Sequence, residues 1–205
     1  DVKGIRDSLY NSFDFITAIA VPMSFGIMAI AKPFAPWFLG RQYDAAGTLM
    51  MFEAPVILFI AWSNVTGTQY LMPINRTKEY TVSVTLGAVV NIIANLFLIA
   101  LWGAKGATIA TDISELTVTA VQLYYIKNTI SRRKLFGNVW KYILSGAIMF
   151  IVIYRLALII NMTVVNLIVE VIVGIIVYLL GIILLKAPIV NQAIKLIQNR
   201  RLEKR

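Results

Sequence analysis

Hydrophobic residues along this chain fall into six runs that are separated by short polar or basic stretches. The runs cover residues 13–31, 49–72, 81–102, 106–126, 142–160 and 164–185. A helix needs about 20 apolar residues to cross a hydrocarbon layer of roughly 30 Å, and each run has about that length. We therefore predict an all-α fold, namely a polytopic membrane protein with six transmembrane helices.

Polar segments flank the first and the last of these runs. Residues 1–12 are polar and mildly amphipathic, and we expect them to end in a loop. Lys32 and Pro33 are expected to end the first helix. After Pro188, apolar residues recur at helical spacing among basic ones, which predicts an interfacial helix and a basic tail over residues 189–205.

The composition supports a membrane protein, because 59% of the 205 residues are hydrophobic and only 14% are charged. A typical soluble domain has about 25% charged residues. The net charge of +9 comes from residues that lie between the runs, so it does not indicate a surface for nucleic acid. Fifteen of the 19 Lys and Arg residues fall on the side of the N-terminus if six helices alternate, and the positive-inside rule then places both ends in the cytoplasm.

The chain has no cysteine and no histidine. This excludes disulfides, thiolate nucleophiles, histidine-based triads and the commonest ligands of transition metals within it. We expect no cofactor and no metal site. Because the chain begins at Asp1 without a methionine, we also expect it to be part of a longer protein.

Two of the runs carry polar residues at helical spacing. In the third run, Gly87, Asn91 and Asn95 recur every four residues and share one stripe of a helix. In the fourth run, six polar residues lie within a sector of about 100°. These six are Thr108, Thr111, Asp112, Glu115, Thr119 and Gln122. A separate stripe of small residues suits close helix packing, and it consists of Gly106, Ala110 and Ser114.

The two acids of the fourth run would lie deep in the membrane. At about 1.5 Å per residue, Asp112 lies roughly 9 Å and Glu115 roughly 13 Å from the start of the helix. A charged carboxylate there costs about 3 kcal/mol or more if it faces lipid. These polar residues therefore either line a hydrated cavity or form hydrogen bonds between helices. Glu53 lies near the outer end of the second run, and we expect it to be interfacial and paired.

An ordered set of short motifs lies between residues 13 and 128. It consists of Pro22, Gly26, Phe38, Leu39, Gly40, Tyr43, Ala46, residues 69–73, residues 78–80, Gly87, Ala88, Asn91, Asn95, residues 103–111 and Glu115. In this order and spacing the set resembles the C-terminal half of Wzx-type oligosaccharide-repeat flippases, in the multidrug/oligosaccharidyl-lipid/polysaccharide superfamily. The last two runs and the tail match only in hydropathy.

The resemblance implies two helical lobes around a central cavity that opens alternately to the two leaflets. Residues 1–137 would form a four-helix part of the C-terminal lobe. Residues 138–205 would form two trailing transmembrane helices and a basic cytoplasmic tail. Half of such a transporter cannot alternate around a central site by itself, so the function belongs to the full-length protein.

By resemblance, the substrate is an undecaprenyl-pyrophosphate-linked oligosaccharide repeat unit. It would be moved across the bacterial cytoplasmic membrane for capsule or exopolysaccharide assembly, with lipid-linked oligosaccharide and membrane lipids as partners. The candidate substrate-binding residues are Gln69, Arg76, Asn91, Asn95, Thr108, Thr119 and Gln122. Asp112 and Glu115 would repel a diphosphate, so we assign them to coupling with protons or sodium ions.

Three other functions compete with this one. A cation-coupled multidrug or metabolite exporter of the same superfamily would use the acids of the fourth run to bind a cationic substrate. An enzyme is disfavoured, because the loops are short and contain neither paired acids at metal-ligand spacing nor a nucleotide-binding glycine motif. A purely structural membrane module is disfavoured to a similar degree, and full activity after removal of the Asp112 and Glu115 side chains would favour it.

Overall fold

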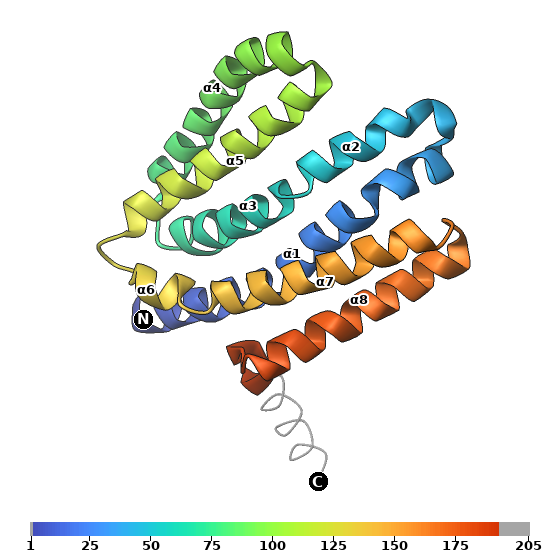
Figure 1. The fold of residues 1–205 in the computed structure, drawn as a ribbon. Helices are drawn as coiled ribbons and strands as arrows, with labels where there is room; N and C mark the ends of the chain where they lie inside the picture. The colour runs from blue at the N-terminus through green and yellow to red at the C-terminus, as the bar shows by residue number, and fades with distance from the viewer. Residues whose placement is uncertain (1, 193–205) are drawn as a thin grey trace.

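The computed structural model of the protein describes residues 2–192, all of which form helices or the short turns between them (Figure 1). The helices are α1 (Val2–Leu39), α2 (Asp44–Glu53), α3 (Val56–Ser63), α4 (Thr77–Trp102), α5 (Ala104–Ile126), α6 (Arg132–Phe136), α7 (Val139–Ile159) and α8 (Val164–Leu184). A short 3₁₀ helix, η1 (Arg41–Tyr43), precedes α2, and a π-helix, η2 (Asn64–Leu71), continues α3.

The helices pack side by side in an order that differs from their order in the chain. The α4–α5 hairpin lies on one side, α2 and α3 pack against α5, and α1 packs against α2 and α3 (Figure 1). On its other side α1 contacts α7, which in turn contacts α8. The first helix of the chain therefore lies in the middle of the assembly.

Within residues 2–192, four stretches are long and apolar enough to cross a membrane. They are the stretches that contain α1, α4, α7 and α8. The bent pair of 41–53 and 56–71 would make a fifth span if it crosses as one unit. The prediction of an all-α polytopic protein is confirmed, whereas six spans are not. The missing one is α5, which has 23 residues but carries Asp112, Glu115 and Gln122, so it is too polar to qualify.

The first helix is longer than the sequence pattern suggested. The expected loop in residues 1–12 is wrong, because α1 already includes these residues from Val2 onward. Packing explains the extension: Leu9 and Phe13 are buried, and the ring of Phe13 lies 5.5 Å from that of Trp62 and 5.2 Å from that of Phe136. Burial of such an apolar stripe stabilises a helix well beyond its local propensity.

The expected helix end at Lys32 and Pro33 is also wrong. Helix α1 continues through Pro33 and Pro36 to Leu39, as membrane helices can when neighbouring groups satisfy the freed carbonyls. It ends where Gly40 adopts a φ of 105°, a conformation that glycine reaches without steric cost.

The predicted helix of residues 49–72 is broken into three parts. It begins earlier, at Asp44, and bends by 41° between residues 53 and 56, where Pro55 cannot donate a backbone hydrogen bond. The hydroxyl of Ser24 on α1 donates to the carbonyl of Ala54 at this bend, at 2.8 Å. The buried polar group at the break is therefore paired by the neighbouring helix.

Two tyrosines join α1 to the last two helices. The hydroxyl of Tyr142 on α7 donates to Asp14 Oδ2 at 2.8 Å, and that of Tyr178 on α8 donates to the carbonyl of Ala18 at 2.8 Å. Both tyrosines are buried. A buried phenol needs a hydrogen-bond partner, so these contacts fix how α7 and α8 sit on α1.

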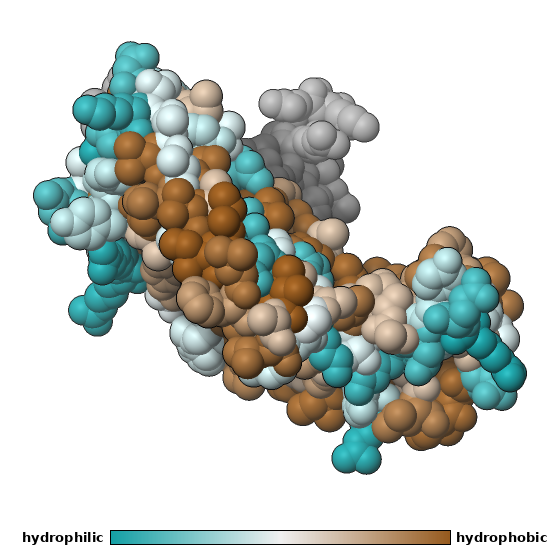
Figure 2. All heavy atoms as spheres, turned by 90° about the horizontal axis from the view of Figure 1, so that it is seen from above, coloured by the Kyte–Doolittle hydropathy of each residue, from teal (hydrophilic) through white to brown (hydrophobic). Residues whose placement is uncertain are grey.

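Large apolar side chains cover the outer faces of α4 and α8. Leu96, Phe97 and Leu101 on α4 are 67–70% exposed, and Leu184 on α8 is 79% exposed. In the view of Figure 2, hydrophobic residues occupy the middle of the molecule, and hydrophilic ones gather towards its two ends. Such a continuous apolar surface suits contact with lipid. Residues 188–192 are helical; the rest of the predicted basic tail, residues 193–205, lies outside the described residues.

Helices α4 and α5 approach closely through small residues, as predicted. The hydroxyl of Ser114 donates to the carbonyl of Gly87 at 2.8 Å, and Gly106 and Ala110 are buried. A Cβ on Gly106 would collide with the backbone carbonyl of Leu98, and one on Gly87 would collide with Val118. The two backbones can lie this close only because these positions lack larger side chains.

We predict that Gly87→Leu lowers the free energy of unfolding by about 1–3 kcal/mol, the usual effect of forcing extra volume into a packed site. Ala88→Leu is the matched control, because Ala88 is exposed on the same helix, and it should change stability by less than about 0.5 kcal/mol. The measurement is thermal unfolding of the full-length protein in detergent. Equal shifts for the two variants would contradict the close packing.

Candidate functional site

Two carboxylates of α5, together with one at the end of α2, lie in the region where α2 packs against α5. Asp112 and Glu115 are half-buried on α5, one turn apart. Glu53, the last residue of α2, lies within electrostatic range of Asp112. The Oδ1 atom of Asp112 is buried and has no hydrogen-bond partner among the described residues. An unpaired carboxylate oxygen beside a second acid is a strong site for a proton or another cation.

No basic side chain within residues 2–192 forms an ion pair with Glu53, Asp112 or Glu115. Within residues 2–192 the one ion pair joins Arg76 to Glu79. The expectation that Glu53 is paired is thus wrong for the described part of the chain, where its charged neighbour is another acid, Asp112. In the same part no group of three or more His, Cys, Asp or Glu residues could hold a metal ion. The acids suit the binding of a proton or a monovalent cation better than a multidentate metal site.

Two asparagines of α4 are bonded to each other. The amide nitrogen of Asn95 donates to the side-chain oxygen of Asn91 at 3.0 Å and to its backbone carbonyl at 2.9 Å. Both residues are half-buried. They lie one and two turns beyond Gly87, on the stripe of α4 that begins against α5. The pair retains donors and acceptors that a hydroxyl-rich ligand could use.

Thr119 and Gln122 are used for packing in this conformation. The hydroxyl of Thr66 on η2 donates to Gln122 Oε1, and Gln122 Nε2 donates to the hydroxyl of Ser83 on α4 at 3.2 Å. The hydroxyl of Thr119 donates to the carbonyl of Phe59 on α3 at 3.0 Å. Thr119 and Gln122 are each 1% exposed, so a ligand cannot reach them unless the helices move.

The remaining predicted site residues lie nearer the surface. Arg76 bridges two helices, because its Nε lies 2.8 Å from Glu79 Oε1 and its guanidinium also donates to the carbonyl of Tyr125 at 3.2 Å. Thr108 is half-buried and donates to the carbonyl of Lys105 at 2.8 Å. Gln69 is exposed on the π-helix. The predicted site residues thus fall into two sets: Thr119 and Gln122 are buried, whereas the others are exposed or half-buried.

The π-helix η2 was missed by reasoning from the sequence. Its residues are polar at several positions, and Gly67 within it would place a Cβ 2.7 Å from Gln122 Nε2 and 2.8 Å from the ring of Tyr80. π-Helical turns are rare and often mark functional positions. A glycine and several polar residues in one apolar run were the available sign of an irregular, closely packed segment.

A cavity of about 470 Å³ opens between α1, α7 and α8. It is lined almost entirely by apolar side chains, and its acidic residue is Glu170. Glu170 is 2% exposed, and its Oε2 atom has no hydrogen-bond partner within residues 2–192. The lining of this cavity is apolar, unlike the polar face of α5, so the cavity suits an apolar chain better than a sugar.

Comparison with known proteins finds a weak similarity in sequence and a clear likeness in fold. No protein-family model matches the chain. It is 28% identical over 90 residues to a protein named "Putative O-antigen transporter" from Escherichia coli (strain K12), an alignment that covers 44% of this chain and 22% of that protein. A solved structure named "Lipid II flippase MurJ, inward closed conformation" matches with a TM-score of 0.78 and 19% identity, over 92% of this chain and 41% of that one.

These findings confirm the resemblance to the flippase superfamily as a weak similarity in sequence and a clear likeness in fold. The chain has the fold of part of a multi-pass membrane transporter. It spans less than half the length of either matched protein. Both matched proteins are transporters by name, which confirms the prediction that the chain is not an enzyme.

We predict that Gln122→Leu destabilises the protein by about 1–3 kcal/mol, because it removes two buried hydrogen bonds, those to the hydroxyls of Thr66 and Ser83, which keep only their bonds to the carbonyls of Trp62 and Tyr80. Gln69→Leu makes the same chemical change at an exposed position of the same region and should be close to neutral. Both are measured as shifts of the thermal unfolding midpoint in detergent. A neutral Gln122→Leu would show that the network contributes nothing to stability.

Proposed function

We propose that the full-length protein is a flippase for lipid-linked oligosaccharides. It moves undecaprenyl-pyrophosphate-linked repeat units across the bacterial cytoplasmic membrane by alternating access, for capsule or exopolysaccharide assembly. The observation that carries the proposal is the likeness of 92% of the chain to part of a lipid II flippase. The partial similarity to an O-antigen transporter supports the same substrate class.

The physical requirement of such transport fits the polar helix. A sugar diphosphate cannot cross the hydrocarbon layer without groups that replace its hydration. Helix α5 offers a row of polar residues while α4, α2 and α3 pack around it. We propose that α5 crosses the membrane as the sixth span, screened from lipid by these neighbours, with both ends of the chain in the cytoplasm.

The predicted site residues then take two roles. Gln69, Asn91, Asn95 and Thr108 are accessible or half-buried and form hydrogen bonds with the sugars. Thr119, Gln122 and Arg76 hold helices together in this conformation and meet the substrate only when those helices separate. Residues 1–137 act as part of one lobe, and residues 138–205 supply two trailing transmembrane helices, α7 and α8, and a basic cytoplasmic tail.

The acids provide the coupling to an ion. Asp112 and Glu115, joined by Glu53, bind a proton or a sodium ion and thereby lose mutual repulsion. A ligand shifts a conformational equilibrium only by binding one state more tightly than the other. A cation that binds best when α2 and α5 are in contact would favour the packing described here over a conformation in which they separate.

The apolar cavity between α1, α7 and α8 supports a lipid-linked substrate. Its volume of about 470 Å³ and its apolar lining match part of a hydrocarbon chain rather than a hydrated sugar. In the proposed cycle the sugar diphosphate follows the polar helix while the lipid part stays in apolar surroundings, so no hydrocarbon has to enter water.

A cation-coupled exporter of drugs or metabolites is the second candidate. The observation that favours it is the unpaired set of acids, which would bind a cationic substrate directly. The two functions differ in one experiment. Efflux of a cationic dye by the full-length protein, together with unchanged surface polysaccharide when its gene is deleted, would support the exporter and contradict the flippase.

We predict that Glu115→Gln in the full-length protein reduces the flipping of lipid-linked oligosaccharide by at least about tenfold, while membrane abundance stays normal. The reason is that the neutral amide cannot exchange a proton or bind a cation as the carboxylate does. Asp44→Asn is the matched control, because Asp44 is exposed at the start of α2. Surface polysaccharide at the wild-type level in Glu115→Gln cells would count against the role of this residue.

We also predict that Asn91 and Asn95 can be reached from water. Single cysteines at these positions should react with a membrane-impermeant maleimide, since this segment has no cysteine of its own. With the reagent applied to both sides of the membrane, cysteine at the exposed loop residue Asn75 is the positive control, and cysteine at the buried Ser83 is the negative control. If both asparagine positions behave like Ser83, these residues pack dry and do not line a pathway.

A further inference from the structure

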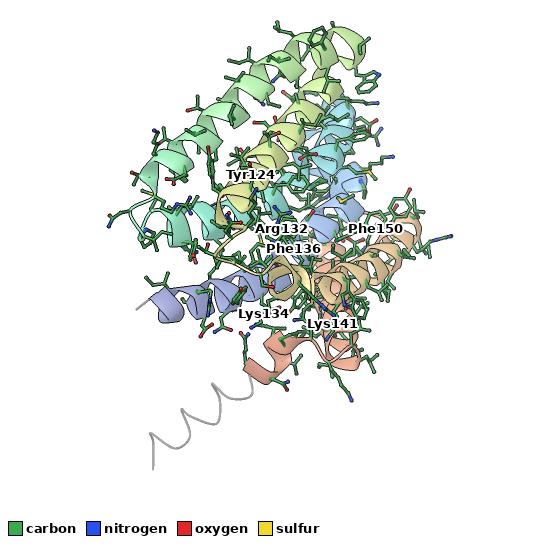
Figure 3. All side chains as sticks on the ribbon, turned by 90° about the vertical axis from the view of Figure 1, so that its left-hand side faces the viewer. Tyr124, Arg132, Lys134, Phe136, Lys141 and Phe150 are labelled. Carbon is green, nitrogen blue, oxygen red and sulfur yellow. The ribbon has the colours of Figure 1, made fainter. Side chains whose placement is uncertain are left out.

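A second cavity, of about 340 Å³, lies where the start of α1 meets the loop between α5 and α6. We call it the basic pocket. It is lined by Arg6, Tyr10, Lys127, Asn128, Thr129, Ile130, Ser131 and Lys134. Figure 3 looks onto this end of the molecule, where Arg132 and Lys134 extend from α6. None of the functions discussed above uses this pocket.

The pocket carries three positive charges and no negative one. Arg6, Lys127 and Lys134 come from three different segments, and no carboxylate is among the lining residues. None of the three forms an ion pair within the described part of the chain. The ammonium of Lys127 lies 3.7 Å from the centre of the Tyr124 ring, a contact that leaves hydrogen-bond donors free. Three cations around one hollow attract an anion.

The walls of the pocket are held in place by hydrogen bonds. The backbone N–H groups of Thr129 and Ile130 donate to the carbonyl of Ile126 at 3.0 and 2.9 Å, and Ile130 is buried in the core. The N–H of Ser131 donates to the hydroxyl of Tyr10 at 2.8 Å. The Tyr10 oxygen is the acceptor in this bond, so its own hydrogen remains available for a ligand. The pocket is therefore preformed, with a neutral donor beside the three cations.

The depth of the pocket indicates where its anion comes from. The apolar run of α1 begins at Phe13, and Tyr10 and Arg6 precede it by roughly 5 and 10 Å along the helix. The head-group layer of a bilayer extends about 5–8 Å beyond the hydrocarbon on each side, within reach of a long arginine side chain. Arginine also matches phosphate oxygens with two parallel hydrogen bonds.

We propose that the basic pocket binds the phosphate group of an anionic membrane lipid in the leaflet next to the start of α1. The lipid then bridges α1 and α6, two segments that are far apart in the chain. The site does not depend on the transported substrate: it would serve a flippase and an exporter equally, and its failure would leave the proposed function untouched.

The test uses the full-length protein in detergent, with phosphatidylglycerol added as the probe and binding counted by native mass spectrometry. Arg6→Gln combined with Lys134→Gln should weaken binding about tenfold or more, since each basic residue near a membrane surface contributes about 1 kcal/mol. Arg132→Gln combined with Arg133→Gln removes the same charge from exposed residues of α6 that do not line the pocket. This control should change binding less than about twofold.

Thermal unfolding midpoints show whether each variant is folded before its binding is compared. An equal loss of phosphatidylglycerol binding in the two double variants would contradict the proposed site, because binding would then depend on the overall charge of the protein. No loss in Arg6→Gln with Lys134→Gln would overturn it as well. Inorganic pyrophosphate distinguishes the source of the phosphate: if it binds with the same dependence on Arg6 and Lys134 while phosphatidylglycerol does not, the assignment to a lipid is wrong.

Discussion

Hydrogen bonds from side chains of α5 to its neighbours hold the polar centre of this molecule together. Ser114, Thr119 and Gln122 reach the backbone or hydroxyl groups of α4, α3 and η2. Each of these bonds is formed away from water, where an unpaired donor is costly. They allow a helix that is too polar for lipid to pack among apolar ones. Within residues 2–192, the side chains of Asp112 and Glu115 on the same helix form no such bond to a neighbouring helix.

Hydropathy alone located every long helix, because the apolar runs have the length and period that a membrane imposes. It failed where neighbouring helices decide the outcome. Pro33 did not end α1, and residues 1–12 joined it since Leu9 and Phe13 found partners far along the chain. Gln122 and Asn91 looked alike in sequence, yet Gln122 is 1% exposed and Asn91 half-buried. A polar stripe in the sequence shows that one face of a helix does not contact lipid. It does not show whether that face contacts other helices or water.

The two cavities and the acidic site lie in different parts of the molecule and differ in chemical character. The acids lie between α2 and α5, the apolar cavity lies between α1 and α8, and the basic pocket lies at the end near α6. A lipid-linked sugar diphosphate needs hydrogen bonds, apolar surroundings and positive charge for its different parts. This segment offers the first two along its length and keeps its cations at the ends of helices. Under the proposed function, the diphosphate would therefore find few charge partners along the polar helix itself.

The central position of α1 has a consequence for how the chain is made. Asp14 receives its hydrogen bond from a tyrosine 128 residues later, and the carbonyl of Ala18 receives one from a tyrosine 160 residues later. During synthesis the first helix thus enters the bilayer long before the groups that complete it exist. Until α7 and α8 follow, one side of α1 must be covered by lipid, by water or by an insertion chaperone, and truncation of those two helices would remove the tyrosine hydroxyl that pairs with Asp14 near the membrane boundary.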